Sequence, residues 1–253
     1  MPCLLLQEAA LVKTIKFENA SYIGDPSNAI RIYNEKEVDE LILLDISARR
    51  NGVKPALDIL ERLASECFMP IAYGGGIADI GMMHELFKRG VEKVAINTMA
   101  YRTPELIRQA SDEFGSQAIV VSIDARKMGD SYEVFVSAGQ EPTGRNPRDW
   151  AEEVVSRGAG EILLTSIDRD GTQSGYDIEL LKEVCPHLDV PVIACGGAGK
   201  VADFGEAVRE GGAAAVAAGS MVVYFGRNRA VLINFPTQRE LLRVLEQKPN
   251  GSK

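Results

Sequence analysis

The amino-acid sequence predicts a single (β/α)8 TIM barrel built from two similar half-barrels. Three observations lead to this fold class. Short apolar runs alternate with amphipathic stretches along 253 residues, eight of these runs have the length of a strand, and the second half of the chain repeats the first. The runs are continuously apolar, as is typical of parallel strands that are buried on both faces. A doubly wound sheet would not require the internal repeat.

The elements follow in a regular order. In chain order we expect strands at residues 3–6, 40–45, 69–73, 93–96, 118–124, 161–167, 190–194 and 215–218. We expect helices at 55–67, 80–89, 104–114, 147–157, 178–184 and 202–210; several begin with proline or end before glycine. Asp130 and Ser131 predict a hairpin turn after the fifth strand. The barrel is expected to span 1–245, followed by a disordered tail at 246–253.

The repeat appears in two pairs of segments that are both offset by 121 residues (159 minus 38, and 191 minus 70). VDELILLDI at 38–46 is similar to AGEILLTSI at 159–167, and PIAYGGG at 70–76 is similar to PVIACGG at 191–197. Because this offset is close to half of the chain, a duplicated four-strand half-barrel explains the whole length.

Composition narrows the functional classes. Apolar residues make up 45% and charged residues 25% of the chain, with a net charge of −8 that is spread along it. This pattern predicts a globular protein without a basic surface for nucleic acid or an anionic membrane. No apolar run approaches the roughly 18 residues of a membrane span, and the first residues do not form a signal peptide, so a cytoplasmic location is expected.

Neither a metal nor an organic cofactor is expected. The four cysteines lack CxxC spacing and are interpreted as small buried apolar residues, and the chain has only two histidines. No dinucleotide-binding fingerprint is present.

Two glycine-rich loops predict phosphate sites. GGG at 74–76 and GGAG at 196–199 each lie between a strand and a helix, where bare backbone can approach a phosphate. Their equivalent places in the repeat predict two sites on opposite sides of the barrel mouth, bridged by a ligand with a phosphate at each end; the alternative is tight turns alone. The predicted phosphate-binding residues are Gly75, Gly76, Asn97, Thr98, Asp170, Gly171, Gly196, Gly197, Gly219 and Ser220.

Acidic residues at strand ends predict acid–base chemistry. Asp45, Asp124 and the loop 168–172 would point into the barrel mouth from different directions. Helix capping is the alternative for one of them. Lys13, in a segment that we expect to be flexible, could cover a phosphate or act on the ligand electrostatically; a solvated surface lysine is the alternative.

Several motifs resemble the cyclase subunit of imidazole glycerol phosphate synthase, from about Cys3 to Tyr224. They are FGSQ at 114–117, VSID at 121–124, GAGEILLTSIDRDGT at 158–172 and GGAG at 196–199. The resemblance implies a barrel that takes ammonia from a glutaminase subunit docked on its lower face. The ammonia would pass through the barrel core to a bisphosphorylated ribulosyl aminoimidazole carboxamide at the upper face. Two aspartates, on strands one and five, close the imidazole ring in that family.

The chain departs from the family at the first of these aspartates. Asp124 matches the strand-five aspartate, whereas Leu5 occupies the strand-one position. Leucine can neither donate nor accept a proton, and acid–base assistance is worth about two to four orders of magnitude in rate.

The lower face keeps the family pattern. By resemblance, Glu40, Lys93 and Glu161 match the charged gate through which ammonia enters, although charges at strand ends are common in barrels. The fourth gate residue of the family, an arginine, would lie ahead of Met1, so either the gate is incomplete or the first strand is clipped.

The variant segments CLLL at 3–6 and KTIKF at 13–17 resemble cyclase paralogues of cell-surface sugar pathways. That resemblance implies a complex with a glutaminase and a sugar amidotransferase, which converts an N-acetyl group to an acetamidino group. The leading hypothesis is therefore a barrel that relays ammonia for acetamidino-sugar formation. The alternatives are a genuine cyclase, a lyase of histidine biosynthesis; a non-catalytic scaffold that activates the glutaminase; and, by fold analogy alone, a phosphosugar isomerase.

Overall fold

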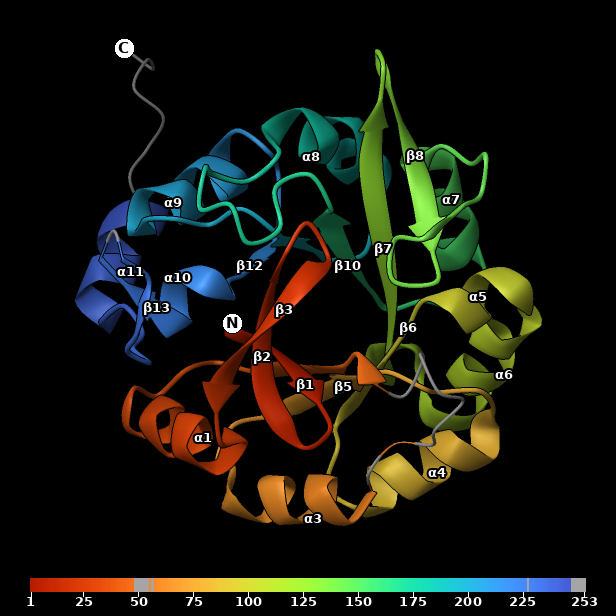
Figure 1. Cartoon of the computed structure of the whole chain (residues 1–253). Coiled ribbons are helices and arrows are strands. Elements are labelled where there is room, and N and C mark those ends of the chain that lie inside the picture. Colours follow the sequence, from red (N-terminus) through yellow and green to blue (C-terminus); the bar gives the residue numbers. More distant parts are fainter. Residues whose placement is uncertain (48–54, 56, 227, 247–253) are drawn as a thin grey trace.

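The structure is a computed structural model that describes residues 1–47, 55, 57–226 and 228–246. Its centre is a closed ring of eight parallel strands, which confirms the predicted TIM barrel (Figure 1). In order around the ring these are β1 (Cys3–Gln7), β4 (Leu41–Asp45), β5 (Ile71–Gly74), β6 (Lys93–Ile96), β7 (Ile119–Met128), β10 (Glu161–Ser166), β11 (Val192–Cys195) and β12 (Ala215–Ala217). A parallel bridge between Pro2 and Ala218 closes the ring.

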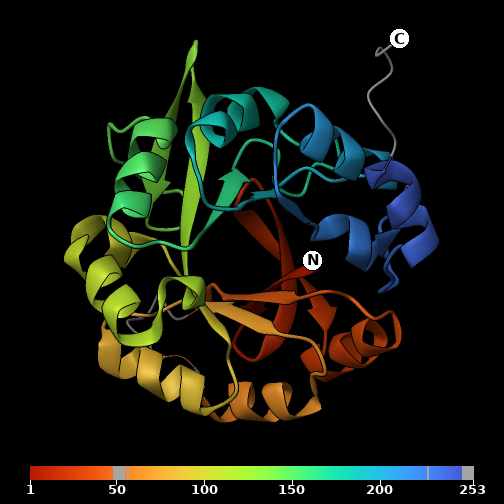
Figure 2. The same ribbon diagram turned by 180° about the vertical axis from the view of Figure 1, so that it is seen from behind.

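Helices surround the strands on the outside (Figure 2). They are α1 (Pro26–Glu35), α3 (Leu57–Glu66), α4 (Ile80–Lys88), α5 (Thr98–Arg102), α6 (Glu105–Phe114), η1 (Ser116–Ala118), α7 (Pro147–Ser156), α8 (Ile178–Val184), η2 (Cys185–His187), α9 (Val201–Arg209), α10 (Ser220–Val223) and α11 (Gln238–Leu245). The six helices expected from the sequence are present within a few residues; α1, α5, α10 and α11 were not expected. None of the helices in the described residues is long and apolar enough to cross a membrane.

Two hairpins project from the ring. The β7 strand continues past the barrel and pairs with β8 (Ser131–Val136), which confirms the predicted hairpin, although its turn lies at Gly129 and Asp130, one residue earlier than predicted; β8 also pairs with β9 (Glu141–Pro142). The second hairpin, β2 (Ala10–Ile15) and β3 (Glu18–Gly24), lies across the centre of the ring in Figure 1. The prediction that the segment around Lys13 is flexible was wrong, because β2 is paired on both sides, with β1 and β3.

A small separate sheet joins β13 (Tyr224–Phe225) to β14 (Ala230–Val231). The tail predicted at 246–253 lies, apart from its first residue, outside the described residues.

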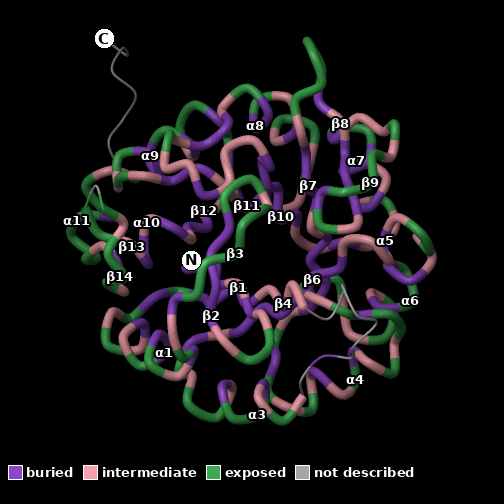
Figure 3. The backbone as a smooth tube through the Cα atoms, in the orientation of Figure 1, coloured by how far each residue is buried: buried purple, intermediate pink, exposed green. Residues whose placement is uncertain are grey.

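The barrel has two apolar layers. Strand side chains that face outward pack with the helices into a large core, so the strands are mostly buried and the helices alternate between buried and exposed (Figure 3). The inner layer receives residues from all eight strands: Cys3, Ile42, Ala72, Ala95, Val120, Leu163, Ile193 and Ala217. Four of these eight side chains are alanine or cysteine, because the interior of an eight-stranded barrel leaves room only for a few larger groups.

The two half-barrels share the same strand register. Leu41 pairs with Ile71 between β4 and β5, and Ile162 pairs with Val192 between β10 and β11. Both partners of the second pair follow those of the first by 121 residues (162 minus 41, and 192 minus 71). The repeat that is visible in the sequence is therefore also a repeat in the hydrogen-bond ladder.

Candidate functional site

Strand register places Leu5 and Asp124 at equivalent positions in the two halves of the barrel. Leu5 pairs with Leu44 on β4, and Asp124 pairs with Thr165 on β10, which follows Leu44 by 121 residues (165 minus 44). At the same level of the mouth, one half therefore carries two leucines, and the other carries a carboxylate and a hydroxyl.

The buried carboxylate of Asp124 is held by the loop that follows the preceding strand. Asn97 Nδ2 donates to Asp124 Oδ2 at 3.0 Å and to the Ser122 carbonyl at 2.9 Å. The Asn97 side chain is fixed in turn, since Thr98 Oγ1 donates to Asn97 Oδ1 at 3.3 Å and accepts from the Ser137 N–H at 3.0 Å. The structure thus joins one predicted phosphate loop to the predicted acid–base residue.

Lys13 reaches into the barrel mouth from β2. Only 5% of Lys13 is exposed, so the alternative of a solvated surface lysine was wrong. Its Nζ donates to the Cys3 carbonyl at 3.4 Å, and a Cβ placed on Gly219 would collide with it. The ammonium group therefore lies directly against Gly219, one of the predicted phosphate-binding residues, at a place where the loop has no side chain.

Asn97 and Gly219 have nearly the same unusual backbone conformation. The φ and ψ angles are −123° and −86° at Asn97 and −108° and −79° at Gly219, and each residue begins a short helix. Beside Gly219, the Ser220 Oγ is buried and has no hydrogen-bond partner among the described residues. Leaving a buried hydroxyl unpaired costs about 1–3 kcal/mol, so this atom is suited to a ligand oxygen or a water molecule.

Asp170 and Gly171 anchor the β2–β3 hairpin. The Asp170 carboxylate accepts from Thr14 Oγ1 at 2.9 Å and from the Phe17 N–H at 3.3 Å. A Cβ on Gly171 would collide with the Thr14 carbonyl, so glycine permits the close approach. These two predicted phosphate residues therefore hold the strand that carries Lys13.

Two further glycines of the predicted phosphate sites also allow close backbone contacts. A Cβ on Gly75 would collide with the Asp45 carbonyl, and a Cβ on Gly197 would collide with the Gly175 carbonyl. At the start of α9, the Asp203 carboxylate accepts from the Gly199 N–H at 2.8 Å and from the Lys200 N–H at 3.1 Å. The Asp203 carboxylate therefore already satisfies backbone N–H groups at the start of α9 and compensates the partial positive charge there.

Asp45 is engaged by the loop that follows it and by the neighbouring strand β5. It accepts from the Ser47 N–H at 2.9 Å and from Tyr73 Oη at 3.3 Å. Burial, with a contribution from Asp45, raises the pKa of Tyr73 well above its usual value, so Tyr73 remains a proton donor in this bond.

At the lower end of the barrel, where the parallel strands begin, Lys93 bridges two glutamates from opposite halves. Its Nζ lies 2.8 Å from Glu40 Oε2 and 2.8 Å from Glu161 Oε1. Glu40 and Glu161 are offset by the same 121 residues as the rest of the repeat (161 minus 40). The second oxygen of Glu40, Oε1, is buried without a hydrogen-bond partner among the described residues.

Burial governs the charges of this cluster. Desolvation raises the pKa of Glu40 despite its bond to Lys93. Desolvation acts to lower the pKa of Lys93, but its hydrogen bonds to Glu161 and Glu40 outweigh that effect and leave the pKa raised. Lys93 therefore remains a cation, and the structure brings together the three residues that the sequence assigned to one gate.

Sequence reasoning missed two buried polar contacts. Asp177 caps α8 and also accepts from Tyr132 Oη at 2.8 Å and from Ser166 Oγ at 3.0 Å. The position of Asp177 before an amphipathic run is typical of a helix cap, but nothing in the local sequence indicates its hydrogen bond to Tyr132 of β8. The thiols of Cys3 and Cys195 also lie close together; their interaction lowers the pKa of Cys3, and the same interaction together with burial raises that of Cys195.

The four cysteines are free, and Cys3 alone among them is fully buried; the other three are half-buried, which corrects the interpretation of all four as buried. No group of three or more metal-ligating side chains is found among the residues that the structure describes.

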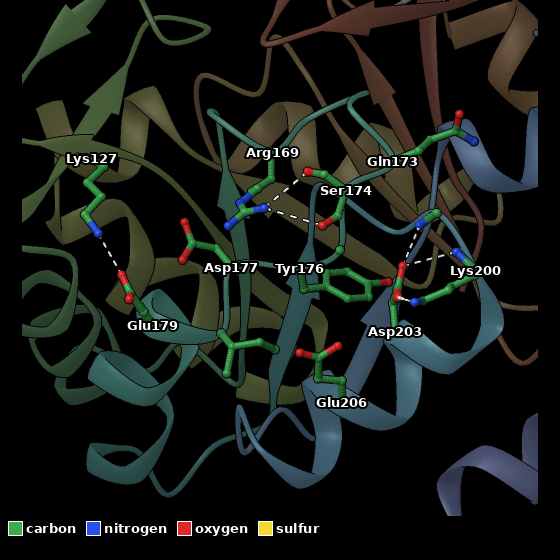
Figure 4. A pocket seen from close by; sticks show the side chains of 13 residues that line it. Lys127, Arg169, Gln173, Ser174, Tyr176, Asp177, Glu179, Lys200, Asp203 and Glu206 are labelled. Carbon is green, nitrogen blue, oxygen red and sulfur yellow. Dashed lines mark hydrogen bonds and ion pairs between the residues drawn. The ribbon is translucent and has the colours of Figure 1, made fainter. Parts of the chain in front are cut away.

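A cavity of about 780 Å³ lies beside the loop between β10 and α8 (Figure 4). Its cations already have partners: Lys127 pairs with Glu179 at 2.7 Å, and Arg169 donates to the Ser174 hydroxyl at 3.2 Å. Neither Asp124 nor Lys13 lines this cavity, whereas Gly199 of the second glycine-rich loop does.

Comparison with known proteins agrees with this geometry. Residues 1–228 match the family model described as histidine biosynthesis protein. A protein of Pseudomonas aeruginosa with the provisional name imidazole glycerol phosphate synthase subunit hisF2 is 50% identical over 95% of this chain and 96% of its own length. The imidazole glycerol phosphate synthase subunit HisF of Hyphomonas neptunium is 47% identical over 89% of each chain. The HisF subunit of Caulobacter vibrioides is 46% identical over 89% of this chain and 87% of its own. The chain therefore belongs to the histidine biosynthesis protein family, as a barrel of the HisF cyclase-subunit type.

Proposed function

We propose that this chain is a HisF-type barrel that relays ammonia from a glutaminase subunit and does not itself close an imidazole ring. In this proposal it works with a sugar amidotransferase that forms acetamidino groups on sugars. One observation carries the proposal: the Glu40–Lys93–Glu161 cluster is assembled at the lower end, while Leu5 stands at the mouth where acid–base chemistry would need a second carboxylate.

The inner layer of the barrel is suited to neutral ammonia. Cys3, Ala72, Ala95 and Ala217 contribute small side chains to it. An ammonium ion would lose its hydration in such surroundings at a cost of several kcal/mol, whereas neutral ammonia carries no net charge. The charged cluster at the entrance and the apolar layer behind it would therefore admit ammonia in its neutral form.

The mouth offers groups for a phosphorylated ligand. Lys13 supplies a buried cation beside Gly219, and the Ser220 hydroxyl supplies an unpaired donor. On the opposite side, Gly75, Gly76, Asn97 and Thr98 form the other predicted site, next to Asp124. We propose that these two sites position a ligand over the barrel axis, where ammonia would emerge.

A second candidate function is a genuine imidazole glycerol phosphate synthase cyclase, a lyase of histidine biosynthesis. The observation that favours it is the hydrogen bond from Asn97 to Asp124, which holds one potential acid–base group in a fixed position. In this case another group would have to replace the carboxylate that Leu5 lacks.

The deciding experiment is an ammonia-dependent cyclase assay. Purified protein receives the bisphosphorylated ribulosyl carboxamide and ammonium salt, and the HisF subunit of Hyphomonas neptunium serves as the positive control. We expect this chain to turn over at least about 100-fold more slowly than the control, because one acid–base group is missing. A rate in the range of the control would overturn the relay and support the cyclase.

The ammonia supply is tested separately, with the glutaminase subunits that the same genome encodes. Glutamate release that rises when the barrel is added would support the proposed partnership. No binding and no stimulation by any of these subunits would contradict it.

A further inference from the structure

Among the described residues, Phe68 is the large apolar side chain that is most exposed to solvent. Phe68 lies in the loop between α3 and β5, at the same end of the barrel as the strand starts that carry the Glu40–Lys93–Glu161 cluster, and is 87% exposed. Its neighbour Met69 is buried, so the loop packs inward and Phe68 alone points out.

The backbone around Phe68 is held in place. Asn34, on α1, accepts from the Phe68 N–H at 2.9 Å and donates to the Glu66 carbonyl at 2.8 Å. One amide side chain thus closes the loop on both sides of Cys67. A side chain on such a fixed backbone loses little conformational freedom when it is buried by a partner.

Three carboxylates belong to the segments around this loop. Asp39, Glu66 and Glu92 belong to the segments that lead into β4, β5 and β6, and all three are exposed. Within the described part of the chain, none of them forms an ion pair, although carboxylates elsewhere on the surface often do. These carboxylates can therefore pair with cations of a partner.

We infer that Phe68 is an anchor for the glutaminase subunit and a determinant of which glutaminase docks. The partner would present an apolar pocket for the phenyl ring, with lysine or arginine residues at its rim. This inference rests on the proposed function, because it takes the lower end as the docking face. Aromatic side chains that are buried at the centre of an interface commonly dominate its binding energy.

The test compares two exposed phenylalanines. Phe68→Ala removes the anchor, whereas Phe225→Ala makes the same change at a side chain that is 67% exposed in β13, beyond the carboxyl end of β12. Each variant is titrated by calorimetry with the glutaminase subunit of the same genome that binds the unaltered chain. We expect Phe68→Ala to weaken binding about 10- to 100-fold and Phe225→Ala to change it less than about twofold.

A salt series tests the acidic rim. Binding of the unaltered chain should weaken as ionic strength rises, because charges at the rim of an interface are screened by salt. Thermal melts of both variants should match that of the unaltered chain, so that a loss of binding is not a loss of folding.

The outcomes separate the two claims. If the unaltered chain binds a glutaminase and Phe68→Ala binds it equally well, the anchor is refuted while the proposed function stands. If the unaltered chain binds none of these glutaminases, the proposed ammonia supply and the anchor fail together.

Discussion

The two halves of this barrel match at the lower end and differ at the upper end. At the lower end, Glu40 and Glu161 are equivalent in the repeat, and Lys93 joins them. At the upper end, Leu5 and Asp124 are equivalent in strand register, but they have opposite chemistry. The comparison teaches that a duplicated backbone keeps its hydrogen-bond ladder, while single side chains decide which half carries a carboxylate at the upper end.

The largest expected effect comes from making the upper end symmetric. Leu5→Asp would place a carboxylate at the level of Asp124, and Leu5 is only half-buried, so the new charge can stay hydrated. If one missing acid–base group is the main difference, ammonia-dependent cyclase activity should rise by about two to four orders of magnitude. The rate is measured with the ribulosyl carboxamide and ammonium salt.

The double variant Leu5→Asp with Asp124→Asn is the matched control and should lose the gain. An unchanged rate in Leu5→Asp would show that the halves differ in more than one carboxylate.

The next largest effect comes from removing the cation that joins the two halves at the lower end. Lys93→Met leaves Glu40 and Glu161 close together without a cation, and we expect it to lower the free energy of unfolding by about 3 kcal/mol near pH 8. Because burial already raises the pKa of Glu40, the folded state takes up protons more readily than the unfolded state. The loss should therefore shrink as pH falls toward 4.5, the usual pKa of glutamate, and it is followed by urea denaturation across that range.

Lys127→Met provides the matched control, since Lys127 and Glu179 form an exposed pair with 45% and 75% of their side chains accessible. Such a pair contributes at most about 1 kcal/mol. Equal losses in the two variants would mean that the lower cluster is no more than a surface ion pair.

A smaller effect is expected at Asp170, a residue of the second half-barrel that anchors the β2–β3 hairpin of the first half-barrel. Asp170→Ala removes the acceptor for Thr14 and for the Phe17 N–H. We expect a loss of about 1–3 kcal/mol in the free energy of unfolding and faster proteolysis within β2 and β3. Asp189→Ala, at an exposed position on another loop, should leave both properties unchanged. A hairpin that resists proteolysis in Asp170→Ala would place its anchor elsewhere.

The hairpin β2–β3 shows why part of the fold was not predictable. Its turn uses Lys16 and Phe17 with φ angles of 53° and 65°, values that sequence patterns associate with glycine or asparagine. Neither residue signals a turn, and the strand around Lys13 mixes lysines with apolar residues. The β7–β8 hairpin was predictable because Gly129 and Asp130 stand between two strand-like runs.

The helices also divide into those that the sequence predicts and those that it does not. The expected helices begin near prolines or capping residues, such as Asn146 before Pro147, whose side chain accepts from the Arg148 N–H at 2.8 Å. The short helices α5 and α10 have no capping side chain and follow their strands directly. They depend on the backbone conformation at Asn97 and Gly219, which no local signal reveals.

The sequence by itself determined the barrel and its repeat, because periodicity and internal similarity can be read without coordinates, and the family resemblance supplied the residues of the lower cluster. Only the tertiary structure decided that Lys13 is buried against Gly219, that the Ser220 hydroxyl is left unpaired and that Phe68 stands exposed beside the lower cluster. These contacts join residues that are far apart in the chain. Their distances are set by the closure of the ring and by the packing of its loops, which spacing along the sequence does not encode.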